Sequence, residues 1–169
     1  INEKSEAIFS GKEKLFGGIY MIVFPQKNSW IECIVDKEQQ FSIFADTANL
    51  FTSTRFLGSK DNALFAEYQK KSYELGTSIS SIQKQIAQSQ PAEAEKLKAS
   101  IQEKSTELQQ YRENFMKTYP DHLLTAIFNV LKDPLVPPAS EHPNGKFDSL
   151  YAYQYYKSHY WDNISFTDE

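Results

Sequence analysis

The side chains that most often carry out covalent chemistry are few in this sequence: one cysteine, Cys33, and three histidines, His122, His142 and His159. Nucleophilic catalysis would need a thiolate activated by a neighbouring base. Cys33 lies on the apolar side of an alternating segment, where a thiol is usually inert packing. The histidines are far apart in sequence and show no partner pattern, and a Cys-x-x-Cys redox motif is absent. The sequence therefore predicts no catalytic residue.

Metal and phosphate sites also lack their sequence patterns. There is no His-x-x-x-His, no pair of cysteines and no Asp-rich calcium loop. The only glycine pair, Gly17-Gly18, leads into an expected strand, whereas a phosphate cradle needs a glycine-rich turn before a helix. Asn163-Ile-Ser165 fits the short sequon for N-glycosylation, a pattern that is common by chance. We expect no metal ion and no cofactor.

The most unusual stretch of the chain is DSLYAYQYYKSHYW, residues 148–161, which contains five of the ten tyrosines. In a helix of about 100° per residue, its rings fall on two nearly opposite stripes. One stripe contains Tyr153, Tyr156 and Tyr160, and the other contains Tyr151, Tyr155 and His159. A helix with two aromatic faces is typical of an element wedged between two layers.

Three interpretations of the two stripes stay open. One stripe faces the core and the other a proline-rich loop, or one is a seam on which another domain docks, or one is a platform for a carbohydrate or other ligand. Tyrosine suits each place because its ring buries apolar area while its hydroxyl reaches a partner or water. The candidate docking or ligand surface consists of Tyr151, Tyr155, His159 and Trp161. A core stripe through Tyr156 predicts that Tyr156→Ala destabilises the chain more than Tyr151→Ala.

The first third of the chain is expected to form a sheet. Apolar segments separated by turn signals predict strands at 19–24, 30–35, 40–45 and 52–57. Gly58 ends the last of them. We therefore predict a small antiparallel sheet, or half of a sandwich, as a β-rich module over residues 1–58.

After Gly58 the apolar period changes from that of a strand to that of a helix. Seven positions at 3-4 spacing run from Phe65 to Ile86, and seven more run from Ala94 to Phe115. This spacing is typical of a coiled-coil seam. With only a short joint between the seams, we expect a long antiparallel helical hairpin over about 61–118, within a helical module of residues 59–169. The hairpin either packs within the chain or serves as a partner-binding or dimerising arm.

Two further helices complete the predicted α+β fold. An apolar stripe predicts a helix with Asp121 as its N-cap. A proline-rich loop with a tight turn at Asn144-Gly145 follows. Asp148 or Ser149 then caps the aromatic helix at about 148–161.

Composition excludes some classes of protein. The chain has 169 residues, of which 40% are apolar and 14% aromatic, which is typical of a globular domain. A net charge of −4 and a pI near 5.5 argue against nucleic-acid binding, which needs a basic surface. The longest apolar runs are far shorter than the roughly 20 residues that span a bilayer. Because the chain begins with Ile1 rather than Met, we interpret it as a processed or trimmed piece of a longer protein.

The order of segments resembles a known family. The segments GGIYMIVFP, WIECIVDKEQQFSIFAD and FLGSKDNALFAEYQ resemble the N-terminal accessory region of envelope thioredoxin-like thiol–disulfide oxidoreductases. The segments LKDPLVPP and DSLYAYQYYKSHYWDNISFTDE look like a domain of unknown function that occurs in the same architecture. The resemblance covers the chain from about Leu15 to Glu169.

This resemblance implies a cellular location and a domain arrangement, but it assigns no catalytic residue to this chain. Such proteins are exported to the periplasm, often with an N-terminal lipid anchor, which here would lie outside this chain, and their Cys-x-x-Cys lies in a C-terminal thioredoxin-fold domain. No position of this chain matches that motif, so no catalytic residue carries over. The resemblance implies a non-catalytic accessory domain for spacing, dimerisation or partner recognition, whose partners are the thioredoxin-fold domain of the same chain and a second copy. The alternative is a stand-alone envelope lipoprotein domain that binds a protein or a ligand.

Overall fold

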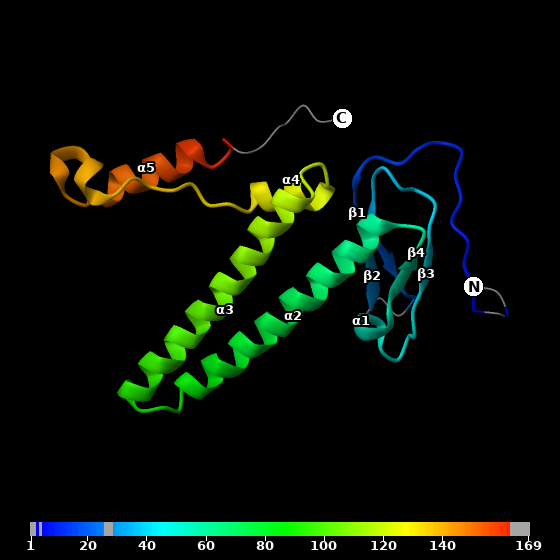
Figure 1. The fold of residues 1–169 in the computed structure, drawn as a ribbon, viewed down its shortest axis with the longest axis horizontal. Helices are drawn as coiled ribbons and strands as arrows, with labels where there is room; N and C mark the ends of the chain where they lie inside the picture. Colours follow the sequence, from blue (N-terminus) through cyan, green and yellow to red (C-terminus); the bar gives the residue numbers. More distant parts are fainter. Residues whose placement is uncertain (1–2, 4, 26–28, 163–169) are drawn as a thin grey trace. The chain divides into compact units, whose positions relative to one another are not determined.

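The computed structural model describes Glu3, residues 5–25 and residues 29–162 (Figure 1). The chain is α+β, and it divides into two compact units, residues 1–73 and residues 74–169. This division lies within one long helix, whereas the predicted module boundary after residue 58 lies where strands give way to helices. The sequon at Asn163 lies outside the described residues.

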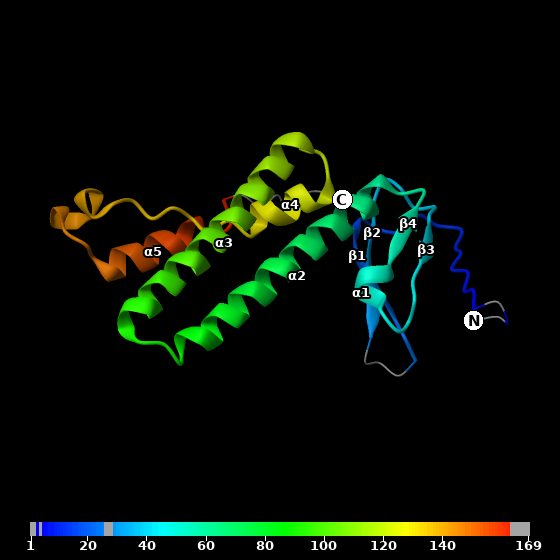
Figure 2. The ribbon, with the colours of Figure 1, turned by 60° about the horizontal axis from the view of Figure 1, so that its bottom comes forward.

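The strands of the first unit form two small antiparallel sheets. β1 (Gly18–Val23) pairs with β2 (Trp30–Val35), and the two lie side by side in Figure 2. β3 (Ser42–Phe44) pairs with β4 (Arg55–Leu57). All four predicted strands are therefore present, but they are divided between two sheets of two strands instead of joining one sheet.

A short helix replaces the beginning of the fourth predicted strand. α1 (Leu50–Ser53) is followed by Thr54, whose Oγ1 donates to the Leu50 carbonyl at 2.6 Å. The Ser53 hydroxyl accepts from the Asp46 N–H at 2.7 Å. Such side-chain hydrogen bonds to nearby backbone compete with a sheet ladder, which explains why the strand begins only at Arg55.

The core of the first unit lies against β2 and the start of α2 (Lys60–Ile86). Its buried apolar side chains are Ile31, Cys33, Ile34, Val35 and Phe65. Gly58 precedes the helix with a φ of +87°, a left-handed conformation that favours glycine. Ser59 then caps α2, because its Oγ accepts from the Asn62 N–H at 3.1 Å.

The two predicted seams are the covered faces of two long helices. α3 (Pro91–Thr118) follows α2 after a short loop and returns antiparallel to the part of α2 that lies in the second unit (Figures 1 and 2). Every seam position is buried or half-buried. The 3-4 spacing thus predicted both long helices and the covered face of each.

The second unit has an aromatic core where α3 meets α4 (Leu123–Val130). The ring of Phe115 lies 5.5 Å from that of Phe128 and 5.1 Å from that of His122, both edge-on. His122 also caps α4, since its Nδ1 accepts from the Leu124 N–H at 3.0 Å. The prediction of Asp121 as the N-cap was wrong by one residue, because the buried imidazole makes the capping bond.

A proline-rich loop leads from α4 to the aromatic helix α5 (Ser149–His159). The predicted tight turn is confirmed, because Asn144 and Gly145 both have left-handed backbones, with φ of 66° and 62°. Two short 3₁₀ turns, Ala139–Glu141 and Pro143–Gly145, complete the loop.

Candidate docking surface and ligand pocket

Asp148 fixes the start of the aromatic helix. Its Oδ1 accepts from the N–H groups of Leu150 and Tyr151 at 2.9 and 3.1 Å. An acidic N-cap satisfies two amides that have no partner inside the helix and lies at the positive end of the helix dipole. Of the two predicted caps, Asp148 and Ser149, the structure therefore confirms Asp148, and α5 has a defined first turn.

His142 ties this first turn to the proline-rich loop. Its side chain is only 4% exposed, its Nδ1 accepts from the Asp148 N–H at 3.0 Å, and its Nε2 lies 2.9 Å from the Pro137 carbonyl oxygen. With Nδ1 accepting, the network assigns the proton of the neutral ring to Nε2, which donates to Pro137. His142 thus has a structural part in holding α5.

Three of the four predicted surface residues form one row of rings. Tyr151 lies 4.7 Å from the His142 ring and 6.2 Å from Tyr155, measured between centroids. Tyr155 stacks on His159 at 3.9 Å with an interplanar angle of 11°. The structure therefore brings Tyr151, Tyr155 and His159 together, as the helical wheel indicates.

Trp161 belongs to the other row. Its ring lies edge-on to Tyr160 at 4.9 Å, and Tyr160 lies 5.6 Å from Tyr156. The Tyr156 hydroxyl donates to Asp133 Oδ1 at 2.8 Å, and this hydrogen bond raises the pKa of the Tyr156 phenol. The candidate surface is thus divided between two faces of one helix.

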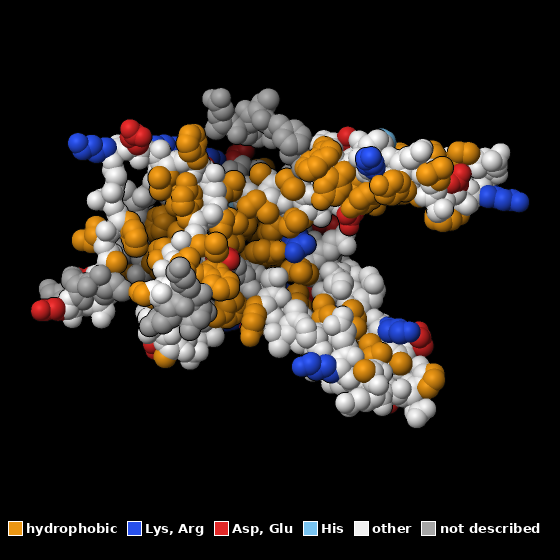
Figure 3. Space-filling model, turned by 180° about the vertical axis from the view of Figure 1, so that it is seen from behind, with side chains coloured by type: hydrophobic (Ala, Val, Ile, Leu, Met, Phe, Trp, Pro, Cys, Tyr) orange, Lys and Arg blue, Asp and Glu red, His pale blue; other side chains and the backbone are white. Residues whose placement is uncertain are grey.

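Neither face of α5 is buried. No residue of the helix reaches the burial of a core side chain, and Tyr153, from the stripe predicted to face the core, is 63% exposed. The expectation of a core stripe is therefore not met. Leu135 and Phe147 of the preceding loop and Leu150 of α5 are also exposed apolar residues, and Figure 3 shows hydrophobic side chains along the arm that carries α5.

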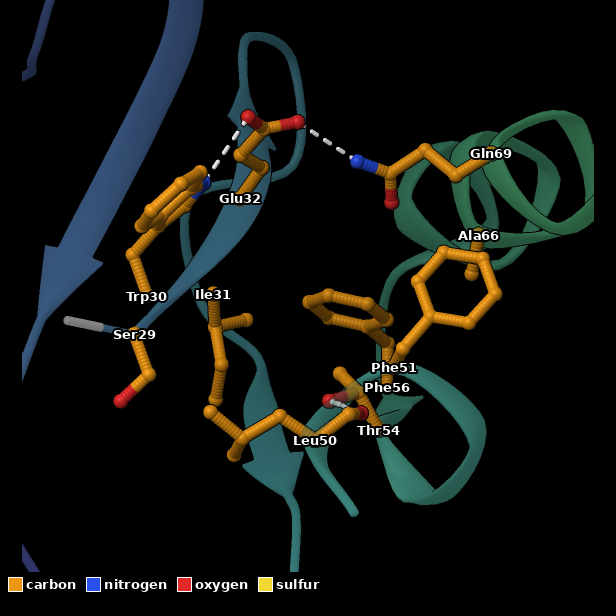
Figure 4. A pocket seen from close by; sticks show the side chains of 10 residues that line it. All are labelled: Ser29, Trp30, Ile31, Glu32, Leu50, Phe51, Thr54, Phe56, Ala66 and Gln69. Atoms are coloured by element: carbon orange, nitrogen blue, oxygen red, sulfur yellow. Dashed lines mark hydrogen bonds between the residues drawn. The ribbon is translucent and has the colours of Figure 1, made fainter. Parts of the chain in front are cut away.

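A second candidate site lies in the first unit, in a cavity of about 410 Å³ beside β2 (Figure 4). β2 contributes Trp30, Ile31 and Glu32 to its wall. The opposite side is formed by α1, by Phe56 of β4 and by the first turns of α2. Sequence reasoning missed this site because it depends on α1, where no helix was predicted and a strand was expected from Thr52 onward.

Glu32 is held at the rim of the cavity by two neutral donors. The indole N–H of Trp30 donates to Oε1 at 3.2 Å, and Nε2 of Gln69 donates to Oε2 at 2.6 Å. Both bonds are drawn in Figure 4. Neither donor carries a charge, so the cavity has a fixed negative group beside apolar walls.

The residues first considered for catalysis have other environments. Cys33 is buried in the first unit, and this burial raises the pKa of its thiol, which makes it a poor nucleophile at neutral pH. The three histidines lie in the second unit, where His122 and His142 cap or brace helix ends and His159 stacks on Tyr155. Across residues 5–25 and 29–162 we find no group of three or more histidine, cysteine or acidic residues that could hold a metal ion.

No helix among the described residues has both the length and the apolar character needed to cross a membrane. Comparisons with protein-family models, with curated proteins and with solved structures gave no match.

Proposed function

We propose that this chain is a non-catalytic accessory domain of an exported, thioredoxin-like thiol–disulfide oxidoreductase, and that α5 is the surface on which the thioredoxin-fold domain docks. The observation that carries the proposal is the exposure of α5. A helix with four tyrosines and no buried residue leaves apolar area in water that a docked partner would cover.

The composition of this surface suits a protein partner. Tyrosine and tryptophan are enriched at the centres of interfaces, because a large ring covers much area while few rotatable bonds are immobilised. Tyr153 and Trp161 are 63% and 54% exposed, so both are accessible in the described chain. The α5 helix is also braced at its N-terminus by Asp148 and His142, which lowers the entropy cost of docking.

The choice of partner rests on the resemblance of residues 15–169 to accessory regions that precede a thioredoxin-fold domain. In this proposal the redox Cys-x-x-Cys belongs to that domain, and Cys33 takes no part. A periplasmic location, with a lipid anchor at the N-terminus of the longer protein, belongs to the same proposal.

The first test is the coding sequence downstream of Glu169. We expect a strand–Cys-x-x-Cys–helix pattern within the length of one domain. If the coding sequence there contains another kind of domain or a stop codon, the proposal is wrong.

The second test measures docking directly. The thioredoxin-fold domain, expressed separately, is titrated into this chain in a calorimeter. We expect the double variant Tyr153→Ala/Trp161→Ala to weaken binding about tenfold or more, as loss of interface aromatic residues commonly does. Phe44→Ala is the matched control, since Phe44 is an aromatic residue of β3 with 57% exposure. Equal effects of the two changes would contradict docking on α5.

A second candidate function is a stand-alone domain that binds a ligand or a protein. The cavity beside Glu32 favours it, because apolar walls and a few oriented polar groups are typical of ligand sites.

A further inference from the structure

The hydrogen bonds that β2 makes show which of its backbone groups point toward β1 and which point toward the cavity. Beyond the end of the ladder, the Phe24 N–H donates to the Ser29 carbonyl at 3.1 Å, so residues 24 and 29 form a hydrogen-bonded pair. The Ile34 N–H, in contrast, donates to Asn62 of α2 at 2.7 Å and so points away from β1. In an antiparallel pair these two kinds of position alternate.

The N–H and C=O groups of Trp30 and Glu32 must therefore point in the same direction as those of Ile34, away from β1. Asn62 covers the edge of β2 at Ile34, and no strand among the described residues pairs with this edge at Trp30 or Glu32. The cavity lies beside these two residues. An open strand edge of this kind is a template for a further strand.

The side chains around this edge differ between the two faces of β2. Successive residues of a strand point to opposite faces, so Ile31 lies on one face and Glu32 on the other. The Ile31 side of the cavity has apolar walls from Leu50, Phe51 and Phe56. Glu32 supplies negative charge, and among the described residues its hydrogen-bond partners are the neutral groups of Trp30 and Gln69.

We propose that this edge binds an extended peptide, which adds a short strand to β2 at Trp30 and Glu32. A peptide residue opposite Glu32 shares its face, so a lysine or arginine there would meet the carboxylate. The two neighbouring residues then point to the Ile31 face, where a leucine-sized side chain would fill the cavity. The expected ligand is an apolar–basic–apolar segment, recognised through its backbone as in other cases of strand addition. The site involves the first unit alone and does not depend on docking at α5.

The test uses a capped pentapeptide, acetyl-Thr-Leu-Lys-Leu-Thr-amide, and the fluorescence of Trp30. The background variant Trp161→Phe leaves Trp30 as the only tryptophan. We expect saturable binding with a Kd on the order of 10–300 μM. This affinity is weak because a short flexible peptide loses conformational entropy when it binds.

Two altered peptides test the backbone hydrogen bonds and the lysine charge separately. Methylating the backbone nitrogen of the lysine removes a ladder donor and keeps every side chain, and we expect about a tenfold or greater loss of affinity. Replacing lysine by norleucine keeps the length without the charge, and we expect about a fivefold loss that disappears in Glu32→Gln.

Matched variants of the protein locate the site. Phe51→Ala changes an exposed wall of the cavity and should weaken binding about fivefold or more, since it removes apolar contact area. Phe44→Ala changes a similarly exposed ring that does not line the cavity and should leave binding unchanged. The proposal is wrong if no peptide binds at 1 mM concentration, or if the N-methylated peptide binds as well as the parent. It is also wrong if both phenylalanine variants have the same effect.

Discussion

Asn62 occupies the edge of β2 as a further strand would, because its side chain makes both hydrogen bonds to the backbone of Ile34. Oδ1 accepts from the Ile34 N–H and Nδ2 donates to the Ile34 carbonyl, each at 2.7 Å. Asn62 is 0% exposed, so water cannot take over either bond. One amide side chain thus joins the first turn of α2 to β2.

Asn62→Ala should therefore be strongly destabilising. The change leaves a buried N–H and a buried carbonyl without partners, and we expect a loss of about 2–4 kcal/mol in the free energy of unfolding. Urea unfolding followed by circular dichroism measures it. Asn114→Ala, at an exposed position of α3, is the control and should change stability by less than about 0.5 kcal/mol. Similar losses for both variants would contradict this account.

Tyr151→Ala and Tyr156→Ala should have similar and small effects on stability. Neither residue is buried, so each change should cost about 1 kcal/mol or less, in contrast to the unequal losses predicted from the helical wheel. Phe115→Ala is the comparison, because Phe115 is buried against Phe128 and His122 and its loss should cost about 3–5 kcal/mol. Thermal melts of the three variants rank them. A large loss of stability from Tyr156→Ala alone would support the prediction that the Tyr156 stripe faces the core.

His142→Ala should loosen the start of α5. The imidazole bridges the Asp148 N–H and the Pro137 carbonyl, so its removal breaks the two hydrogen bonds that connect the first turn of α5 to the loop. Hydrogen exchange should show about tenfold or greater loss of protection at the amides of Leu150 and Tyr151. His159→Ala, at the other end of the helix, should leave those amides within about twofold. The bridge is unimportant if the two variants exchange alike.

Cys33 should be unreactive in the folded chain. Burial raises the pKa of its thiol, so the folded state keeps the proton to higher pH than the unfolded state. The contribution of this thiol to stability is therefore complete below the unfolded-state pKa of about 8.5 and is lost as the pH rises above it. We expect slow labelling by Ellman's reagent at pH 8 without urea and fast labelling with urea.

Cys33→Ala supplies the matched pH series. Its free energy of unfolding should fall less between pH 8 and pH 10 than that of the unchanged chain, because one proton released on unfolding has been removed. Fast labelling of native Cys33, or parallel pH profiles, would show that the thiol is accessible.

The sequence by itself determined the local secondary structure of this protein. Apolar spacing predicted both long helices and the covered face of each, and alternation predicted four strands, because these periods follow from backbone geometry alone. Turn and cap chemistry is equally local, which is why Asp148 and the Asn144-Gly145 turn could be predicted. The burial of Cys33 followed from its place in an alternating segment.

What each face packs against depends on residues far away in the sequence, and this only the tertiary structure decided. The helical wheel separated the row of Tyr151, Tyr155 and His159 correctly from Tyr156. It did not place Trp161 beside Tyr160, and it could not show that neither row is buried. The cavity beside Glu32 requires β2, α1, β4 and α2 to converge, and the pairing of Asn62 with Ile34 spans 28 residues. The local spacing of apolar residues indicates whether a segment is a helix or a strand. Burial and pairing depend instead on long-range contacts, whose individual free energies are small.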